Sequence, residues 1–226
     1  VKWEEEGERY SSTFSSNTGA IGATHSISIG KKTFLRSALV GSVYDNNYRE
    51  KRLNDNYVNE SRAQGQTLND RAILSTTLHH KFNAKHSIRT GLIFSRIGFS
   101  IEQRDYDFEK DAVVKTLDVS ESTYTTQGFA TWMNRITEKL SLQLGVHYLG
   151  LAINETYSVE PRAGIKYTVN EKQSLSLGYG LHSQIQPIGV YFAEVSDSSG
   201  KVFTPNKNLE LTKSHHVVVG YDRMLK

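Results

Sequence analysis

The sequence has no cysteine among its 226 residues and only three prolines. Without cysteine there can be no disulfide bonds, thiolate catalysis or thiolate zinc sites, which suits a protein that crosses an oxidising periplasm. No apolar run exceeds about four residues, whereas a membrane-spanning helix needs about 18 or more. We therefore exclude a helical membrane protein. The only structure with which this chain could span a bilayer is a β-barrel.

The sequence also lacks a block of charge of one sign. Its 27 Lys and Arg and 24 Asp and Glu give a net charge of +3 that is spread along the chain. No basic cluster could neutralise phosphates, so nucleic acid is not an expected partner. Hydrophobic residues make up 37% of the chain, below the usual ~45–50% of a globular domain, although Tyr and Phe are plentiful. A dense soluble core is therefore not expected.

What is present is long alternation of apolar and polar residues, with no stripe of helical period. Along residues 140–148, one apolar face is formed by Leu140, Leu142, Leu144, Val146 and Tyr148. The same period of two recurs over residues 162–170 and 174–182, and it predicts β-strands with one apolar and one wet face. Residues 88–101 slip phase between Phe94 and Ile97, which we interpret as a single-residue bulge.

A short charged repeat marks the predicted turns. It reads NAKHSI at 83–88, TEKLSL at 137–142 and NEKQSL at 170–175, with a looser copy at 30–32. Each copy has the length of a hairpin turn. The connections at the other end, residues 45–68, 105–122 and 187–211, are predicted to be long polar loops, apart from a brief link near Glu155. Short turns at one end and long loops at the other are typical of a transmembrane barrel.

Strand length and number complete the fold prediction. Several strands exceed the usual ~5–6 residues and reach the ~9–11 that a tilted membrane strand needs. From Thr18 we count about nine strands, the last from Thr212 to about Leu225. A free piece of barrel would leave two unpaired edges. We therefore expect residues 1–226 to be one partial domain of an antiparallel up-and-down transmembrane barrel, not closed, without a signal peptide and cut from a longer protein.

Two alternatives remain at this point. The apolar faces could turn inward, which would give a soluble or surface-exposed β-sandwich or β-barrel binding module. A small complete outer-membrane barrel would need an even number of strands, and therefore one more strand within residues 1–17.

The C-terminal part of the chain resembles the barrel of TonB-dependent receptors, especially the large Bacteroidetes-type outer-membrane transporters. The resemblance is carried over residues 157–226 by EPRAGI at 160–165, SLSLGYGLHSQ at 174–184, PNKNLELTKSHH at 205–216 and GYD at 220–222. It implies a barrel of about 22 strands with a plug. Such a barrel lies in the bacterial outer membrane and imports a scarce siderophore, vitamin, glycan or peptide.

The resemblance also implies a set of partners. They are outer-membrane lipid, the plug and remaining barrel strands, an inner-membrane energy-coupling complex, and the imported ligand. The plug and the periplasmic coupling segment are not recognisable in the sequence, and no closing strand with a terminal aromatic residue is present.

Aromatic residues in the outer loops are the predicted ligand contacts. They lie among Asn, Asp, Arg and Ser, a mixture that suits stacking on sugars or aromatic chelators while hydrogen-bonding their edges. These residues are Tyr48, Tyr57, Tyr106, Phe108, Tyr191 and Phe192. A membrane-interface girdle is predicted separately from Tyr44, Tyr148, Tyr167, Tyr179 and Tyr221.

No enzyme activity, metal site or cofactor is expected. In the pairs His79-His80 and His215-His216, adjacent strand residues point to opposite faces and cannot chelate one ion. A hydrolase triad built on His182 and Ser183 lacks the Gly-x-Ser-x-Gly motif and an oxyanion hole.

Glycines recur on the polar face at positions 145, 164, 178 and 180. They mark either strong strand twist or a place where a ligand or plug approaches the wall, and we favour twist.

Overall fold

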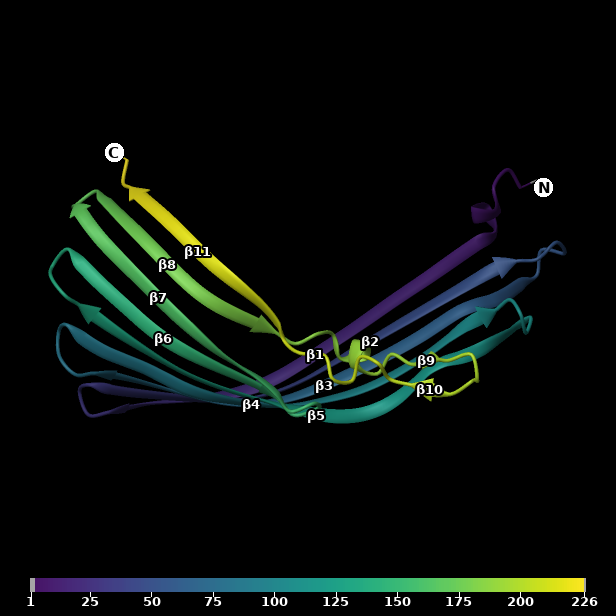
Figure 1. The fold of residues 1–226 in the computed structure, drawn as a ribbon, viewed down its shortest axis with the longest axis horizontal. Helices are drawn as coiled ribbons and strands as arrows, with labels where there is room; N and C mark the ends of the chain where they lie inside the picture. The colour runs from purple at the N-terminus through teal and green to yellow at the C-terminus, as the bar shows by residue number, and fades with distance from the viewer. Residues whose placement is uncertain (1–2, 226) are drawn as a thin grey trace.

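A computed structural model describes residues 3–225 as one long, curved antiparallel sheet of nine strands, with the shape of an open trough (Figure 1). The strands pair in chain order, β1 to β8 and then β11, which confirms the predicted meander. Their bounds are β1 Tyr10–Ile29, β2 Thr33–Leu53, β3 Asn59–Lys81, β4 His86–Asp107, β5 Ala112–Arg135, β6 Leu140–Leu151, β7 Thr156–Asn170, β8 Gln173–Gln184 and β11 Thr212–Arg223. Before β1 lies a short 3-10 helix, η1 (Glu6–Arg9).

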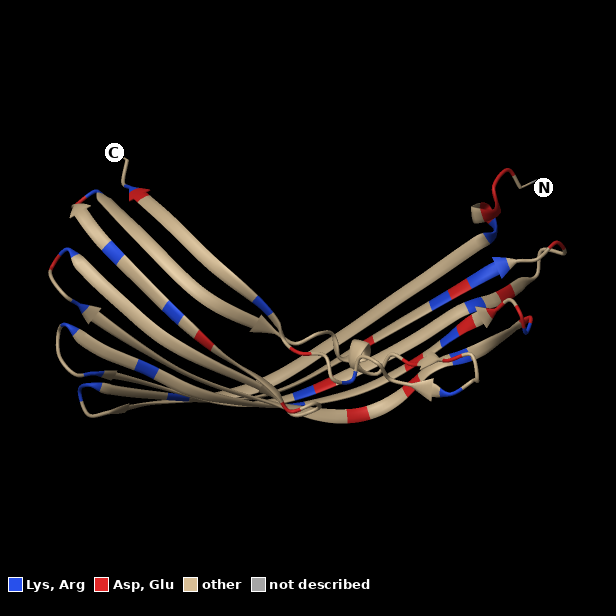
Figure 2. Ribbon diagram, in the orientation of Figure 1, with Lys and Arg blue, Asp and Glu red and all other residues tan. Residues whose placement is uncertain are grey.

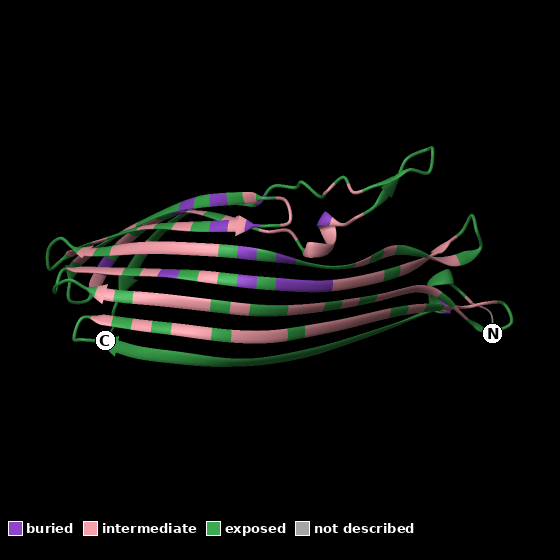
Figure 3. Ribbon diagram, turned by 90° about the horizontal axis from the view of Figure 1, so that it is seen from below, coloured by how far each residue is buried: buried purple, intermediate pink, exposed green. Residues whose placement is uncertain are grey.

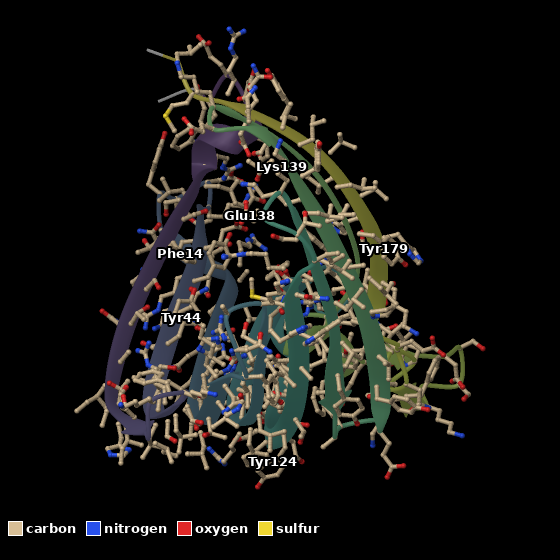
Figure 4. The ribbon with its side chains drawn as sticks, turned by 90° about the vertical axis from the view of Figure 1, so that its left-hand side faces the viewer. Phe14, Tyr44, Tyr124, Glu138, Lys139 and Tyr179 are labelled. Atoms are coloured by element: carbon tan, nitrogen blue, oxygen red, sulfur yellow. The ribbon has the colours of Figure 1, made fainter. Side chains whose placement is uncertain are left out.

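The period-two alternation places apolar side chains on the convex face of the trough. Leu39, Leu92 and Val217 are 59%, 62% and 68% exposed there, and Figure 4 shows Tyr124 and Tyr179 projecting from the same side. Within residues 3–225 no second sheet covers this face. The sandwich alternative, which turns the apolar faces inward, is therefore wrong.

The four predicted short turns lie together at one end of the trough (Figure 1). In the β3–β4 turn, the Asn83 side-chain oxygen accepts hydrogen bonds from the backbone N–H groups of Lys85 and His86 at 2.8 and 2.9 Å. Asn170 accepts from Lys172 in the β7–β8 turn at 2.9 Å, and Thr137 has the same role between β5 and β6. Short side-chain acceptors at the start of three of the four turns explain the sequence repeat, whereas the β1–β2 turn begins with Gly30 at a positive φ of 65°.

The predicted long loops over residues 45–68 and 105–122 are wrong, because most of these residues belong to strands. The β2–β3 connection occupies only residues 54–58 and the β4–β5 connection only residues 108–111, because the strands continue beyond them. β5 has 24 residues and is therefore about 80 Å long at ~3.3 Å per residue. The residues on either side of the β2–β3 connection are mostly polar, which is why this segment looks like a loop in the sequence.

Two further strand predictions need correction. β1 begins at Tyr10, earlier than the predicted Thr18, and no separate strand precedes it within residues 3–9. β4 shows no bulge between Phe94 and Ile97, and its register with β5 shifts instead between Gln103 and Arg104. The apparent phase slip arises because Ile97 and Phe99 are apolar residues on the concave face, where they are buried.

The connection between β8 and β11 is the long loop that the sequence predicts. It contains α1 (Ile188–Tyr191) and a small hairpin of β9 (Val195–Ser196) and β10 (Val202–Phe203). The loop folds onto the concave face, where the Phe192 and Phe99 ring centroids are 4.9 Å apart. Buried residues gather beneath it on the neighbouring strands (Figure 3). The buried apolar residues on the strands are Ile97, Phe99, Leu149 and Leu151, and the loop itself contributes Tyr191 and Leu211.

No helix within residues 3–225 is long and apolar enough to cross a membrane.

Candidate functional site on the concave face

The concave face of the trough is polar apart from the apolar cluster beneath the β8–β11 loop. Its centre is the Glu160 carboxylate on β7, whose side chain is only 2% exposed. His147 Nδ1 and an Arg162 guanidinium nitrogen lie 2.9 and 2.8 Å from one of its oxygens, and the backbone N–H of Ser183 donates to the other at 3.1 Å. Burial of a carboxylate is costly without such partners, so these three residues make the site tenable.

This network extends to one further strand, β5, and to a second residue of β7. His147 Nε2 lies 3.2 Å from the side-chain oxygen of Gln127 on β5, and Ser183 donates to Ser158 at 2.6 Å. Polar groups from β5, β6, β7 and β8 are thereby held in one layer under the β8–β11 loop. The layer offers hydrogen-bonding groups to the trough but no nucleophile poised beside a base.

Four of the six predicted ligand contacts lie on the projecting hairpins. Tyr48 donates a hydrogen bond to Glu50 at 2.7 Å, and Tyr57 sits in the β2–β3 turn at a positive φ of 60°. Tyr106 lies with its ring 3.8 Å from the Arg62 guanidinium carbon and contacts the ring of Phe108, which is 82% exposed. The structure therefore brings Tyr106 and Phe108 together, beside a cation, at the end of the β4–β5 hairpin.

The other two predicted contacts belong to the inward-folded loop. Tyr191 is fully buried and its hydroxyl accepts a hydrogen bond from the Gln186 backbone at 3.2 Å. Phe192 packs on Phe99. These two side chains anchor the loop to the wall, so the six residues do not form one cluster.

Four of the five tyrosines predicted for the girdle lie on the convex face. Tyr148, Tyr167, Tyr179 and Tyr221 are 39–57% exposed on the convex face. The prediction for Tyr44 is wrong. Tyr44 follows Val43, whose side chain is on the convex face, and therefore lies on the concave face.

The girdle prediction missed four other aromatics of the convex face, Phe94, Tyr124, Trp132 and Tyr157, although the same alternation places them. The rings of Tyr148 and Tyr157 stack at 6.1 Å. Tyr157 and Tyr167 are ten residues apart on β7, which gives about 33 Å along the strand and roughly 25 Å across a bilayer at the usual tilt. That spacing fits the apolar band of an outer-membrane barrel.

Adjacent histidines do point to opposite faces. The His215 ring stacks on Tyr179 on the convex face, whereas His216 contacts His182 on the concave face, with ring centroids 4.8 Å apart. Within residues 3–225 no three His, Asp or Glu side chains are arranged to hold a metal ion.

The family follows from comparison with known proteins. A family model described as "TonB dependent receptor-like, beta-barrel" matches residues 3–225. The chain belongs to the TonB-dependent receptor family. This confirms the resemblance first found in residues 157–226 and extends it over nearly the whole chain. Members of this family are outer-membrane proteins of Gram-negative bacteria.

Solved TonB-dependent receptors share the fold at low sequence identity. The ferric-catecholate import receptor Fiu from E. coli K12 aligns with a TM-score of 0.67 and 15% identity over 95% of this chain and 39% of its own. The copper transporter OprC aligns with a TM-score of 0.65 and 12% identity, over 98% of this chain and 38% of its own. The RagAB peptide importer aligns with a TM-score of 0.61 and 9% identity, over 95% of this chain and 28% of its own. No curated protein matched in a sequence search. The chain thus spans less than two fifths of these three solved receptors.

Proposed function

We propose that this chain forms part of the wall and several outer loops of a TonB-dependent outer-membrane importer of a scarce ligand. Residues 1–226 would then be one partial barrel domain, completed by further strands, closed by a plug and coupled to an inner-membrane energy source. The wall itself would catalyse no reaction. The imported ligand would be a siderophore, vitamin, glycan or peptide.

The observation that carries this proposal is the opposition of the two faces of the sheet. The convex face is apolar and bounded by tyrosines at both ends of β7, whereas the concave face holds a hydrogen-bonded polar network around Glu160. Only a wall with lipid on one side and water on the other satisfies both faces. The free edges of β1 and β11, which have no second neighbour within residues 3–225, support further strands on either side.

The six aromatic residues remain the proposed ligand contacts, with different roles. Tyr48, Tyr57, Tyr106 and Phe108 would meet the ligand first, at the projecting hairpins. Tyr191 and Phe192 would contribute only if the β8–β11 loop lifts from the wall. After capture, movement of the plug would open a polar path along Ser141, Gln143 and His147.

Deletion of the parent gene tests the import function even while the ligand is unidentified. Wild-type and deletion strains are grown under nutrient limitation, and the spent media are compared by mass spectrometry. We expect one class of solute to be depleted only by the wild type, with depletion abolished by a protonophore. Identical depletion in the two strains, or depletion unaffected by the protonophore, would overturn the proposed function.

A further inference from the structure

Two adjoining hollows line the concave face near the short turns. The larger, of about 750 Å³, extends from His79 on β3 to Val218 on β11. The smaller, of about 280 Å³, continues it over β7, β8 and β11, and both are floored by Gln143, Gly164, Gly178 and Val218. We call the two together the basic groove.

The groove is lined by charge of one sign. Lys81, Lys85, Arg135 and Lys166 line the larger hollow and Arg162 the smaller. Three histidines of the concave face, His79, His182 and His216, complete the set. Among the described residues, no carboxylate lines either hollow. The charge distribution along the strands agrees: Lys and Arg outnumber Asp and Glu at the turn end and on the nearby strand segments (Figure 2).

Most of this positive charge has no partner in the chain. Arg162 is paired with the buried Glu160, and Lys166 lies 3.9 Å from Asp222. Lys81, Lys85 and Arg135 form no ion pair within the described residues. Unneutralised like charges around one concavity repel each other and raise the local concentration of anions.

The floor of the groove leaves room for a bound molecule. Gly164 and Gly178 face each other across β7 and β8. A Cβ atom on Gly178 would meet nothing within 4 Å, and one on Gly164 would make only ordinary contacts at 3.9 and 4.0 Å. Neither glycine has a positive φ. Packing within this chain does not require them, and their bare backbone allows a ligand to approach the wall closely.

We propose that the basic groove binds the imported ligand during passage, and that this ligand is an anionic solute bearing carboxylate or phosphate oxygens. The inference rests on the proposed import function and narrows its ligand to one chemical class. Lys81, Lys85, Arg135 and Lys166 attract and hold the anion, while Ser141, Gln143 and Ser176 supply neutral hydrogen bonds along the same surface.

A thiol at the floor of the groove measures the local potential directly. The chain has no cysteine, so Gly178→Cys in the full-length receptor, with any cysteine elsewhere in the protein replaced, adds a single reporter where the Cβ fits. Reaction rates are compared for an anionic sulfonatoethyl and a cationic trimethylammonioethyl methanethiosulfonate. The ratio of the anionic to the cationic rate is divided by the same ratio measured for Phe108→Cys, on the exposed tip of the β4–β5 hairpin. Ser176→Cys, a near-isosteric change in the same hollow, is the second reporter.

We expect the normalised ratio to favour the anionic reagent by about tenfold or more. Lys166→Gln with Arg135→Gln should bring the ratio to within about twofold of the reference. The matched pair Lys201→Gln and Lys207→Gln removes the same charge from the outer loop and should leave the ratio unchanged. Pyrophosphate or citrate should slow the reaction at position 178, and spermidine should not.

Three outcomes would overturn the proposal. The first is a ratio near that of the reference, and the second is protection by spermidine equal to that by pyrophosphate. The third is complete unreactivity of the thiols at both 176 and 178 in the intact receptor, which would show that the plug covers the groove. The depletion assay with deletion strains is read separately. If the deletion strains show import but the thiols react equally with both reagents, the anion site is refuted and the import function stands. If the thiols prefer the anionic reagent but the deletion strains show no import, the import function is refuted and the anion site stands.

Discussion

Asn83 and Asn170 occupy equivalent positions in two short turns and show how single residues specify this sheet. Each places an acceptor oxygen against backbone N–H groups that the tight reversal leaves unpaired. The charged repeat in the sequence therefore located all of these turns correctly.

Loss of the Asn83 acceptor should be measurable. Asn83→Ala removes two hydrogen bonds and should lower the free energy of unfolding by about 1 kcal/mol or slightly more, whereas Asn170→Ala removes one and should cost about half as much. Urea unfolding of the full-length receptor in micelles, followed by tryptophan fluorescence, measures both. Asn83→Asp keeps the acceptor and is the control. Equal losses in Asn83→Ala and Asn83→Asp would contradict the turn assignment.

Asp197 gives the β9–β10 hairpin a dependence on pH. Hydrogen bonds from the Ser199 hydroxyl, and then from the Lys201 and Ser199 backbone N–H groups, lower the pKa of this exposed carboxyl below its usual 3.8. A lowered pKa means that the ionised form stabilises the hairpin above the unfolded pKa. That stability is lost as the pH falls through the lower, folded value.

The hairpin should therefore be unaffected at neutral pH and loosen only below the usual pKa. Backbone amide chemical shifts of Ser199 and Lys201, followed from neutral pH to about pH 2, should show an inflection below that of an unperturbed Asp. Asp197→Asn should abolish the inflection. An inflection at or above the usual Asp value would refute the hydrogen-bonding role.

Among the elements, the membrane-spanning parts of the strands were the most predictable from sequence. Through most of β6, β7 and β8, apolar residues of the convex face alternate with polar residues of the concave face. Toward the far ends of β2 to β5 this contrast weakens, and the residues near the two connections resemble loops in sequence. β4 reads as bulged because Ile97 and Phe99, on its concave face, are covered by a loop about 90 residues later in the chain. No local pattern reveals such a distant contact.

The β8–β11 loop depends on its aromatic anchors. Phe192→Ala removes the contact with Phe99 and should weaken docking of the loop by about 1–3 kcal/mol. Opening of the loop would then become several-fold more frequent, and trypsin should cleave after Lys201 and Lys207 correspondingly faster. Phe108→Ala, at an exposed tip, should leave cleavage unchanged. Wild-type cleavage rates in Phe192→Ala would show that Tyr191 alone holds the loop.

At the scale of the whole molecule, the decisive unknown in the sequence was the direction of the apolar face. Alternation defines two faces but not which one is inside, because a sandwich and a membrane barrel use the same pattern. The curvature of the sheet answers this, since the face of Leu144 and Leu177 is convex and exposed. The basic groove was equally hidden, because its lining residues come from seven strands and from the β3–β4 turn.

Two adjacent positions on β6 test the orientation of the whole wall. Leu144 lies on the convex face and Gln143 on the concave face, at nearly the same depth. Leu144→Arg should lower the free energy of unfolding of the full-length receptor in lipid bilayers by about 2–4 kcal/mol, because it places a charge in hydrocarbon. Gln143→Arg introduces the same side chain one residue away, facing the aqueous trough, and should cost less than about 1 kcal/mol. Denaturant titration of bilayer-inserted receptor compares them. If Gln143→Arg were the more destabilising change, the convex face could not be the one in contact with lipid.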